Sequence, residues 1–293
     1  MLIFFPVDNG FDFSSSLMEI APNLFVPIAY GGNVPSVSYP EQFFEQNRAD
    51  LSNFWIGRRN RNIERRLRQY GKSTILEIGS GHGAVARYLA SQGFSVRCVE
   101  PQIAGATQTA SQGIQTLVST TPCDHLKAKS QDAVGIFDVL EHVQSEQTLL
   151  RSIHDLLSPN GVLIITVPTG NWLFSNTDIA LGHFRRYSRK RLRQVMHESG
   201  FDEASSNYIF LTLVPFAFLF RVVPYRFGFK QRPNQPLESV SEVLNSRSFA
   251  SRLVGFVSHI EELFDRLCVL PYGLSIIGVY KARGTPTGDQ DSD

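Results

Sequence analysis

The chain has 293 residues, with 28 Lys or Arg against 27 Asp or Glu, which leaves a formal net charge of +1 at pH 7. This balance argues against a nucleic-acid-binding protein, whose domain would normally be strongly basic. Hydrophobic residues make up 42% and charged residues 19%, which is typical of a folded globular protein. Cys98, Cys123 and Cys268 are far apart; this spacing excludes a disulfide framework and a paired-cysteine metal site, and it favours a cytoplasmic location.

The two ends of the chain differ from its middle. Residues 1–40 hold five prolines and no sustained helical period, so we expect an irregular N-terminal extension there. Residues 41–70 carry apolar side chains at helical spacing and are expected to form an amphipathic helical region. Residues 284–293 are polar, and we expect a disordered tail.

Short apolar segments alternate with helical segments through the middle of the chain. The segments with strand character are residues 74–78, 94–99, 114–118, 133–139, 162–167, 204–210 and 274–281. Apolar strands that alternate with helices predict a parallel sheet covered on both faces. Residues 211–270 interrupt this alternation, and we expect them to form an insertion before the last strand.

A glycine-rich turn follows the first of these strands. The run from Glu77 to Gly83 reads Glu-Ile-Gly-Ser-Gly-His-Gly, and glycines there let a ligand lie against bare main chain. Glu100 comes at the end of the second strand, where a carboxylate can accept both hydroxyl hydrogens of a ribose. A dinucleotide fingerprint needs its third glycine one residue later, where Ala84 stands. The turn therefore favours another nucleotide-like ligand, with a plain tight turn as the alternative.

Three further motifs follow the glycine turn along the chain. They are Phe137-Asp138-Val139-Leu140-Glu141-His142-Val143, the run from Pro159-Asn160-Gly161 to Pro168, and Trp172…Asp178…Gly182-His183-Phe184-Arg185-Arg186-Tyr187. Over residues 54–281 the order resembles a bacterial branch of the class I S-adenosylmethionine-dependent methyltransferases. The resemblance implies a Rossmann-like α/β domain over residues 41–283, with a seven-stranded, mostly parallel sheet, an antiparallel last strand, helices on both faces and a helical insertion.

The same resemblance implies S-adenosyl-L-methionine as the cofactor and names the residues that would contact it. They are Glu77, Gly79, Ser80, Gly81, Gly83, Glu100, Asp138, Leu140, Trp55 and Arg59. Trp55 and Arg59 are expected to close over the cofactor. The motif that usually supplies the adenine contact after the third strand is not clear in this chain. Asp124 is the candidate residue for this contact.

Methyl transfer from a sulfonium is an in-line displacement, so the protein mainly has to align the acceptor with the methyl carbon. No metal ion is required. A hydroxyl acceptor also needs a base, for which His is best matched at neutral pH. His142 and His183 are the candidate catalytic residues, and Asp178 is near enough in sequence to orient His183. His142 could instead cap a helix or pack beneath the cofactor.

The acceptor is expected to meet Asp178, Arg185, Arg186 and Tyr187. Two adjacent arginines could hold a phosphate or carboxylate of the acceptor by forked hydrogen bonds. They could equally pair with Glu141 or Asp178 and only brace the loop.

Residues 208–232 combine an apolar run with four basic side chains, and no acid occurs from residue 211 to 236. Such a stretch suits an anionic membrane surface. We therefore expect a small-molecule acceptor, with a lipid link and a peripheral contact at the inner face of the membrane as a hypothesis. The alternative is a lid or homodimer face that packs against a helix over residues 251–267. At about 20 Å, the apolar run 208–220 is too short to span a membrane.

The sequence thus predicts a methyltransferase that acts on a small-molecule, lipid-linked or glycan-linked acceptor, with a hydroxyl oxygen favoured. Two alternatives stay open. One is an NAD(P)-dependent oxidoreductase, against which the glycine spacing argues. The other is a methyltransferase-like protein that binds the cofactor or a partner and transfers nothing. No nucleic-acid partner is expected.

Overall fold

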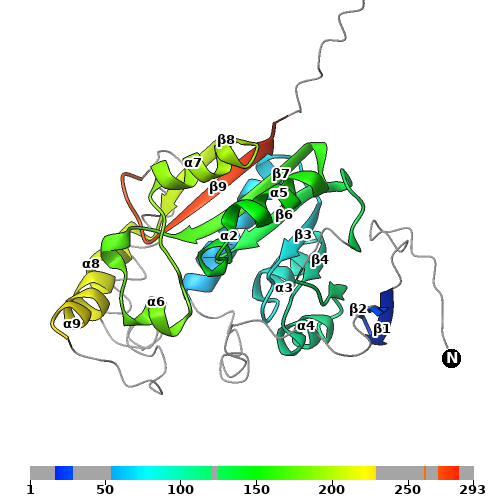
Figure 1. The fold of residues 1–293 in the computed structure, drawn as a ribbon, viewed down its shortest axis with the longest axis horizontal. Helices are drawn as coiled ribbons and strands as arrows, with labels where there is room; N and C mark the ends of the chain where they lie inside the picture. The colour runs from blue at the N-terminus through cyan, green and yellow to red at the C-terminus, as the bar shows by residue number, and fades with distance from the viewer. Residues whose placement is uncertain (1–16, 29–53, 121–124, 229–260, 262–269, 284–293) are drawn as a thin grey trace, which may run out of the picture.

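The computed structural model describes residues 17–28, 54–120, 125–228, 261 and 270–283 (Figure 1). These residues contain one nine-stranded sheet with the strand order β1-β2-β5-β4-β3-β6-β7-β9-β8. The strands are β1 (Leu17–Ala21), β2 (Leu24–Pro27), β3 (Thr74–Ile78), β4 (Ser95–Val99), β5 (Thr116–Leu117), β6 (Gln131–Phe137), β7 (Leu157–Pro168), β8 (Phe201–Ile209) and β9 (Ser275–Ala282).

Strands β3 to β9 lie at the seven predicted segments. Strands β3 to β7 pair in parallel, and β9 is antiparallel to both of its neighbours, β7 and β8. The prediction of a mostly parallel sheet with an antiparallel last strand is therefore confirmed. The predicted number of seven strands is wrong, because the structure adds two strands before them.

The two additional strands form a hairpin within the segment expected to be irregular. Asn23 turns the chain with a left-handed φ of 64°, and its backbone N–H donates to the Glu19 carboxylate over 2.9 Å. Strand β2 then pairs in parallel with the two-residue β5. Leu24 and Val26 are buried against α4, so the hairpin extends the sheet and covers an edge that a strand as short as β5 would leave open.

The described helices are α2 (Phe54–Gln69), α3 (Ala84–Ser91), α4 (Ile103–Ala110), α5 (Glu146–Leu156), α6 (Asn176–Ala180), α7 (Arg189–Glu198), α8 (Val214–Ala217) and α9 (Val223–Arg226). Helix α2 falls inside the predicted helical region, of which residues 41–53 lie outside the described residues. Helix α6 is one turn long and starts with a reciprocal capping box between Ser175 and Asp178.

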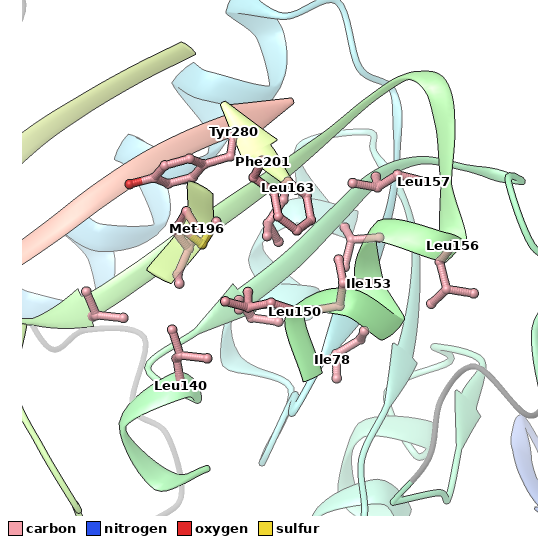
Figure 2. Close-up of a cluster of buried hydrophobic side chains, with 14 of the residues drawn as sticks. Ile78, Leu140, Leu150, Ile153, Leu156, Leu157, Leu163, Met196, Phe201 and Tyr280 are labelled. Carbon is pink, nitrogen blue, oxygen red and sulfur yellow. The ribbon is translucent and has the colours of Figure 1, made fainter. Parts of the chain in front are cut away.

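Two core layers cover the two faces of the sheet. Along β7, Leu163, Ile165 and Val167 belong to one buried cluster, and the alternating residues Val162 and Ile164 belong to the other, as the period of two in a strand requires. Figure 2 shows the first cluster, in which α5 and α7 pack on the sheet. Helices α2 and α3 cover the second cluster. Helices therefore lie on both faces, as predicted.

The insertion is helical in its described part. Helices α8 and α9 flank a π-helical turn, η6 (Phe218–Val222), and lie at the opposite end of the molecule from the β1–β2 hairpin (Figure 1). No helix in the described parts of the chain has the length and apolar character needed to cross a membrane. The rest of the insertion, apart from residues 261 and 270, lies outside the described residues, and so does the expected tail. The expected helix over 251–267 belongs to this part except for residue 261. The domain boundaries stay predictions.

Candidate active site

The candidate site lies along one edge of the sheet. Because β3, β4, β6 and β7 are parallel, their carboxyl ends meet at the same edge. The glycine turn, Glu100, the segment from Asp138 to His142 and the loop from Thr169 to Tyr187 follow these four ends in turn. The register Ile78↔Val99 makes the first two direct neighbours, since Gly79 donates its N–H to the Val99 carbonyl over 2.7 Å.

The glycine turn leaves bare main chain that only glycine can supply. Gly79 has a φ of +77°, and a Cβ there would lie 2.6 Å from a methyl carbon of Val139. Gly83 has a φ of +71°, and a Cβ there would lie 2.8 Å from the Thr109 hydroxyl. Both positions combine a left-handed backbone with close packing, so the turn is built tightly against its surroundings.

Two buried acids flank this turn. Burial raises the pKa of Glu77 to about 8, with a contribution from Glu100, and its Oε2 atom has no hydrogen-bond partner among the described residues. Burial also raises the pKa of Glu100 to about 7. Glu100 accepts backbone N–H groups from Gly81 over 2.7 Å and from Gln102 over 2.9 Å. Its carboxylate therefore holds the second strand end against the glycine turn.

The other predicted cofactor contacts have partners within the protein. Asp138, with a left-handed φ of 56°, pairs with Arg59 and accepts the Thr166 hydroxyl over 3.0 Å. The Leu140 side chain is fully buried in the core, which leaves only its backbone for a ligand. Trp55 stacks on Phe210 with ring centroids 3.7 Å apart. The Ser80 hydroxyl, by contrast, is buried and has no hydrogen-bond partner among the described residues. The adenine candidate Asp124 lies outside the described residues.

This arrangement fits an adenosyl amino acid. The glycine turn has partly exposed main chain without side chains, the Glu100 carboxylate beside it could accept ribose hydroxyls, and the unsatisfied Glu77 oxygen could accept an ammonium group. None of these features requires a phosphate. The residues present therefore fit S-adenosyl-L-methionine better than a dinucleotide.

Both predicted histidines lie at this edge, in contact. The rings of His142 and His183 meet edge to face with centroids 4.6 Å apart. Nδ1 of His183 lies 2.9 Å from Asp178 Oδ1, so the carboxylate fixes the ring orientation. Burial and the neighbouring His183 lower the pKa of His142 to about 4. His183 is therefore the better-equipped proton acceptor of the two.

Close to these histidines lies a carboxyl group that was not among the predicted site residues. Glu141 is fully buried, and its carboxylate accepts no hydrogen bond from any other described residue. Burial, together with Asp138, holds its pKa well above the usual range. Glu141, His142 and His183 each offer one ligand atom, and these atoms lie within 4.8 Å of one another. The group could hold a divalent cation; that none is needed stays a prediction.

The loop residues expected to meet the acceptor are largely engaged in bracing. Arg186 forks onto Asp178 with contacts of 2.7 and 3.1 Å, and Asp178 also accepts the N–H and hydroxyl of Ser175. Tyr187 is fully buried and donates to Glu146 over 2.7 Å, and burial together with this hydrogen bond raises the pKa of its hydroxyl. Arg185 also pairs with Glu146, at 2.6 Å. These contacts favour the bracing alternative over acceptor binding.

Sequence reasoning missed Glu146, whose carboxylate joins Tyr187, Arg185 and Arg191. It lies in the first turn of α5. An acid at that position is normally explained by its favourable interaction with the helix dipole. Glu141 was visible beside His142, but its complete burial depends on the tertiary fold. An acid directly before a histidine at a strand end is the sequence signal that could have found it.

The comparisons with known proteins agree with this geometry. Residues 43–205 match the family model described as Methyltransferase domain. A ubiquinone biosynthesis O-methyltransferase of Rickettsia canadensis (strain McKiel) is 33% identical over 100 residues, which cover 32% of this chain and 42% of the relative. Its counterpart from Caulobacter sp. (strain K31) is 31% identical over 98 residues, covering 31% and 39%. The chain thus matches about two fifths of the length of these relatives.

A solved structure shares the fold. Phosphoethanolamine N-methyltransferase 2 of Haemonchus contortus, in complex with S-adenosyl-L-methionine, superposes with a TM-score of 0.50 at 16% identity and covers 85% of this chain and 61% of its own. At this identity the likeness shows a common Rossmann-like fold and nothing finer. The family match spans more than half of the residues, and the chain therefore belongs to the methyltransferase-domain family.

Proposed function

We propose that the protein is an O-methyltransferase that acts on a hydroxyl group of a small-molecule or lipid-linked acceptor. S-adenosyl-L-methionine is the methyl donor, and when bound it supplies the sulfonium methyl group. The observation that carries the proposal is the contact of the Asp178–His183 pair with His142 at the sheet edge that also presents the glycine turn. The family match supports methyl transfer over the oxidoreductase alternative.

The protein's own residues divide the work of binding and proton transfer. Glu77 would accept the ammonium group of the cofactor, Glu100 its ribose hydroxyls, and the turn from Gly79 to Gly83 its methionine portion. Arg59 neutralises Asp138 and keeps it in place beside the site. His183 would take the proton of the acceptor hydroxyl, and Asp178 would stabilise the resulting imidazolium.

Oxygen is the favoured acceptor atom for two reasons. A hydroxyl must lose a proton on methylation, and the site holds an oriented histidine that can accept it. In addition, the matched relatives from Rickettsia and Caulobacter are named O-methyltransferases of ubiquinone biosynthesis. Their name supports oxygen as the target and an apolar, ring-bearing acceptor as the kind of molecule to test first.

An apolar acceptor also agrees with the surface. Of nine exposed large apolar residues in the described parts of the chain, seven lie between residues 172 and 227. They are Trp172, Ile179, Phe184, Leu219, Phe220, Tyr225 and Phe227. The two segments that hold them meet where the Trp172 and Phe218 rings lie 5.7 Å apart. Such a surface would suit a lipid-linked acceptor and a peripheral membrane contact.

The direct test incubates the purified full chain with methyl-labelled cofactor and a panel of catechols, phenols, amines and lipid-extract fractions, followed by mass spectrometry of labelled products. We expect label on the oxygen of a hydroxylated, apolar compound. Label on nitrogen or carbon would overturn the O-methyl assignment. Tight binding of S-adenosylhomocysteine without any labelled product would favour the catalytically silent alternative.

A further inference from the structure

Arg221, a basic residue of the insertion, takes no part in the ion pairs that brace the loop after β7. Arg221 lies in η6, the π-helical turn between α8 and α9. Pro224 follows three residues later and has no backbone N–H with which to continue an α-helical pattern, which favours the wider turn before it. Turns of this kind recur at functional sites.

The fold carries this turn to the candidate active site. Turn η6 contacts the segment Asn171–Leu173, where the Trp172 and Phe218 rings lie 5.7 Å apart. The Asn171 side chain accepts the backbone N–H of Arg186 over 3.3 Å. Arg186 in turn holds Asp178, the partner of His183. A short chain of contacts therefore connects η6 to the proposed base.

The charges at this junction do not balance. Arg221 is half-buried, and burial and the nearby Arg186 lower the pKa of its guanidinium, while Asp178 acts in the opposite direction. Asp178 is already engaged by Arg186, His183 and Ser175. Arg221 itself makes no hydrogen bond or ion pair within the described residues. Asp178 is therefore the nearby carboxylate for both Arg186 and Arg221, but only Arg186 contacts it. A half-buried cation without a partner lowers the stability of the fold.

We propose that Arg221 binds an oxyanion group, a phosphate or a carboxylate, of the acceptor. The inference rests on the proposed function, since it assigns a binding group to the acceptor of the same site. From the sequence, Arg185 and Arg186 were the candidates for binding an anion of the acceptor, but both are paired with carboxylates of the protein. We assign this role to Arg221 instead, because its guanidinium donors are still available.

The neighbours of Arg221 define the rest of the acceptor. Leu219 and Phe220 precede it and are more than half exposed, as is Phe184 beside the base. The ligand that satisfies both features carries an anionic group next to an apolar body. The proposal therefore specifies an anionic amphiphile with a methylatable hydroxyl group.

The test titrates the full chain with sodium phosphate and with sodium acetate at constant ionic strength and follows the thermal midpoint. The variants are Arg221→Gln, the charge-conserving Arg221→Lys, and the control Arg226→Gln, which alters an exposed arginine on α9. We expect wild type and Arg226→Gln to respond alike to one or both anions. In Arg221→Gln the apparent affinity should fall about tenfold or more, with Arg221→Lys in between.

A parallel titration with S-adenosylhomocysteine keeps the outcomes apart. Unchanged affinity for this ligand in Arg221→Gln shows that the variant is folded. An equal anion response in Arg221→Gln and wild type, or no response of wild type to either anion, would overturn the assignment. Failure of wild type to bind S-adenosylhomocysteine would instead contradict the proposed function, because the anion titration does not depend on the cofactor.

Discussion

At the scale of single residues, the main feature of the site is the orientation of the His183 ring by the Asp178 carboxylate. The carboxylate is buried and fixes the imidazole through Nδ1, whereas burial keeps His142 neutral by lowering its pKa to about 4. A base held in one orientation contributes by accepting a proton during the reaction rather than by binding. The two histidines should therefore behave differently on substitution.

We expect His183→Ala to lower kcat by about 10²-fold to 10⁴-fold, because the acceptor proton loses its acceptor. Affinity for S-adenosylhomocysteine should not change. Asp178→Asn should also lower kcat and shift the pH–rate profile. The matched control is His197→Ala on the exposed end of α7. Full activity of His183→Ala would contradict the assignment, and loss of wild-type activity in EDTA would reassign Glu141, His142 and His183 to a cation.

Glu77 gives a prediction in the pH dependence of stability. Its pKa is about 8 in the folded chain and about 4.5 in the unfolded one. The folded state therefore binds the extra proton between these values, and stability is lost as pH rises through them. The free energy of unfolding of Glu77→Gln should fall less steeply with rising pH than that of wild type. The two slopes should differ by up to about 1.4 kcal/mol per pH unit, which is the contribution of one proton. Urea unfolding at pH 5.5 to 8.5 measures the difference, and parallel pH profiles of the two proteins would refute the buried-acid account.

At the scale of elements, the glycine turn can be tested against a matched position. Gly79 and Gly93 both have a left-handed backbone, but a Cβ has open space at Gly93 and meets Val139 at 2.6 Å at Gly79. Gly93→Ala should cost about 1 kcal/mol of stability from the backbone alone. Gly79→Ala should cost more and also weaken S-adenosylhomocysteine binding, as calorimetry would show. Equal effects at the two positions would mean that the turn is not tightly packed.

A second element-scale prediction concerns the ion pair between helix α2 and the insertion. Arg58 and Glu261 are both buried and lie 2.8 Å apart, and Glu261 also accepts the backbone N–H groups of Leu211 and Thr212. Glu261→Ala should lower the free energy of unfolding by about 3–5 kcal/mol, since it breaks a buried ion pair and removes the acceptor of two backbone N–H groups. The exposed pair of Arg193 with Glu203 provides the control, where Arg193→Gln should cost less than about 1 kcal/mol. Similar losses in the two variants would contradict the proposed role of the buried pair.

The elements also show what local sequence can predict. Strands β6 and β7 each contain a mostly apolar run, residues 133–137 and 162–167, and the positions of the two strands follow from that pattern. Strands β1 and β2 are only five and four residues long, and their hairpin gains its stability from the pairing of β2 with β5 and from packing on α4. No local period marks the hairpin, because β5 lies about ninety residues further along the chain.

The candidate site divides in the same way. The sequence placed Glu100, His142 and His183 at one edge because each follows a strand end, and this depends only on strand order. The pairing of Arg186 with Asp178 and the isolation of Arg221 depend on how the loop and the insertion pack. Adjacent arginines look alike in sequence whether they bind a ligand or brace a loop.

At the scale of the whole molecule, the extra hairpin and the insertion lie at opposite ends of the sheet (Figure 1). The apolar surface is concentrated toward the insertion, with seven exposed large side chains from Trp172 to Phe227. We expect flotation with vesicles that contain phosphatidylglycerol at low salt, weakened in the double variant Leu219→Ser with Phe220→Ser. The single variant Ile20→Ser, on the distant hairpin, is the control. Recovery of all wild-type protein in the soluble fraction would remove the membrane contact.

The central claim is that the edge formed by β3 and β4 binds the cofactor, with Glu100 on the ribose. The most direct measurement is calorimetric titration of S-adenosylhomocysteine into wild type and Glu100→Ala. We predict one ligand per chain for wild type and at least about tenfold weaker binding for the variant, because a carboxylate that accepts two hydroxyl hydrogens is lost. Equal affinities, or no binding by wild type, would contradict the account.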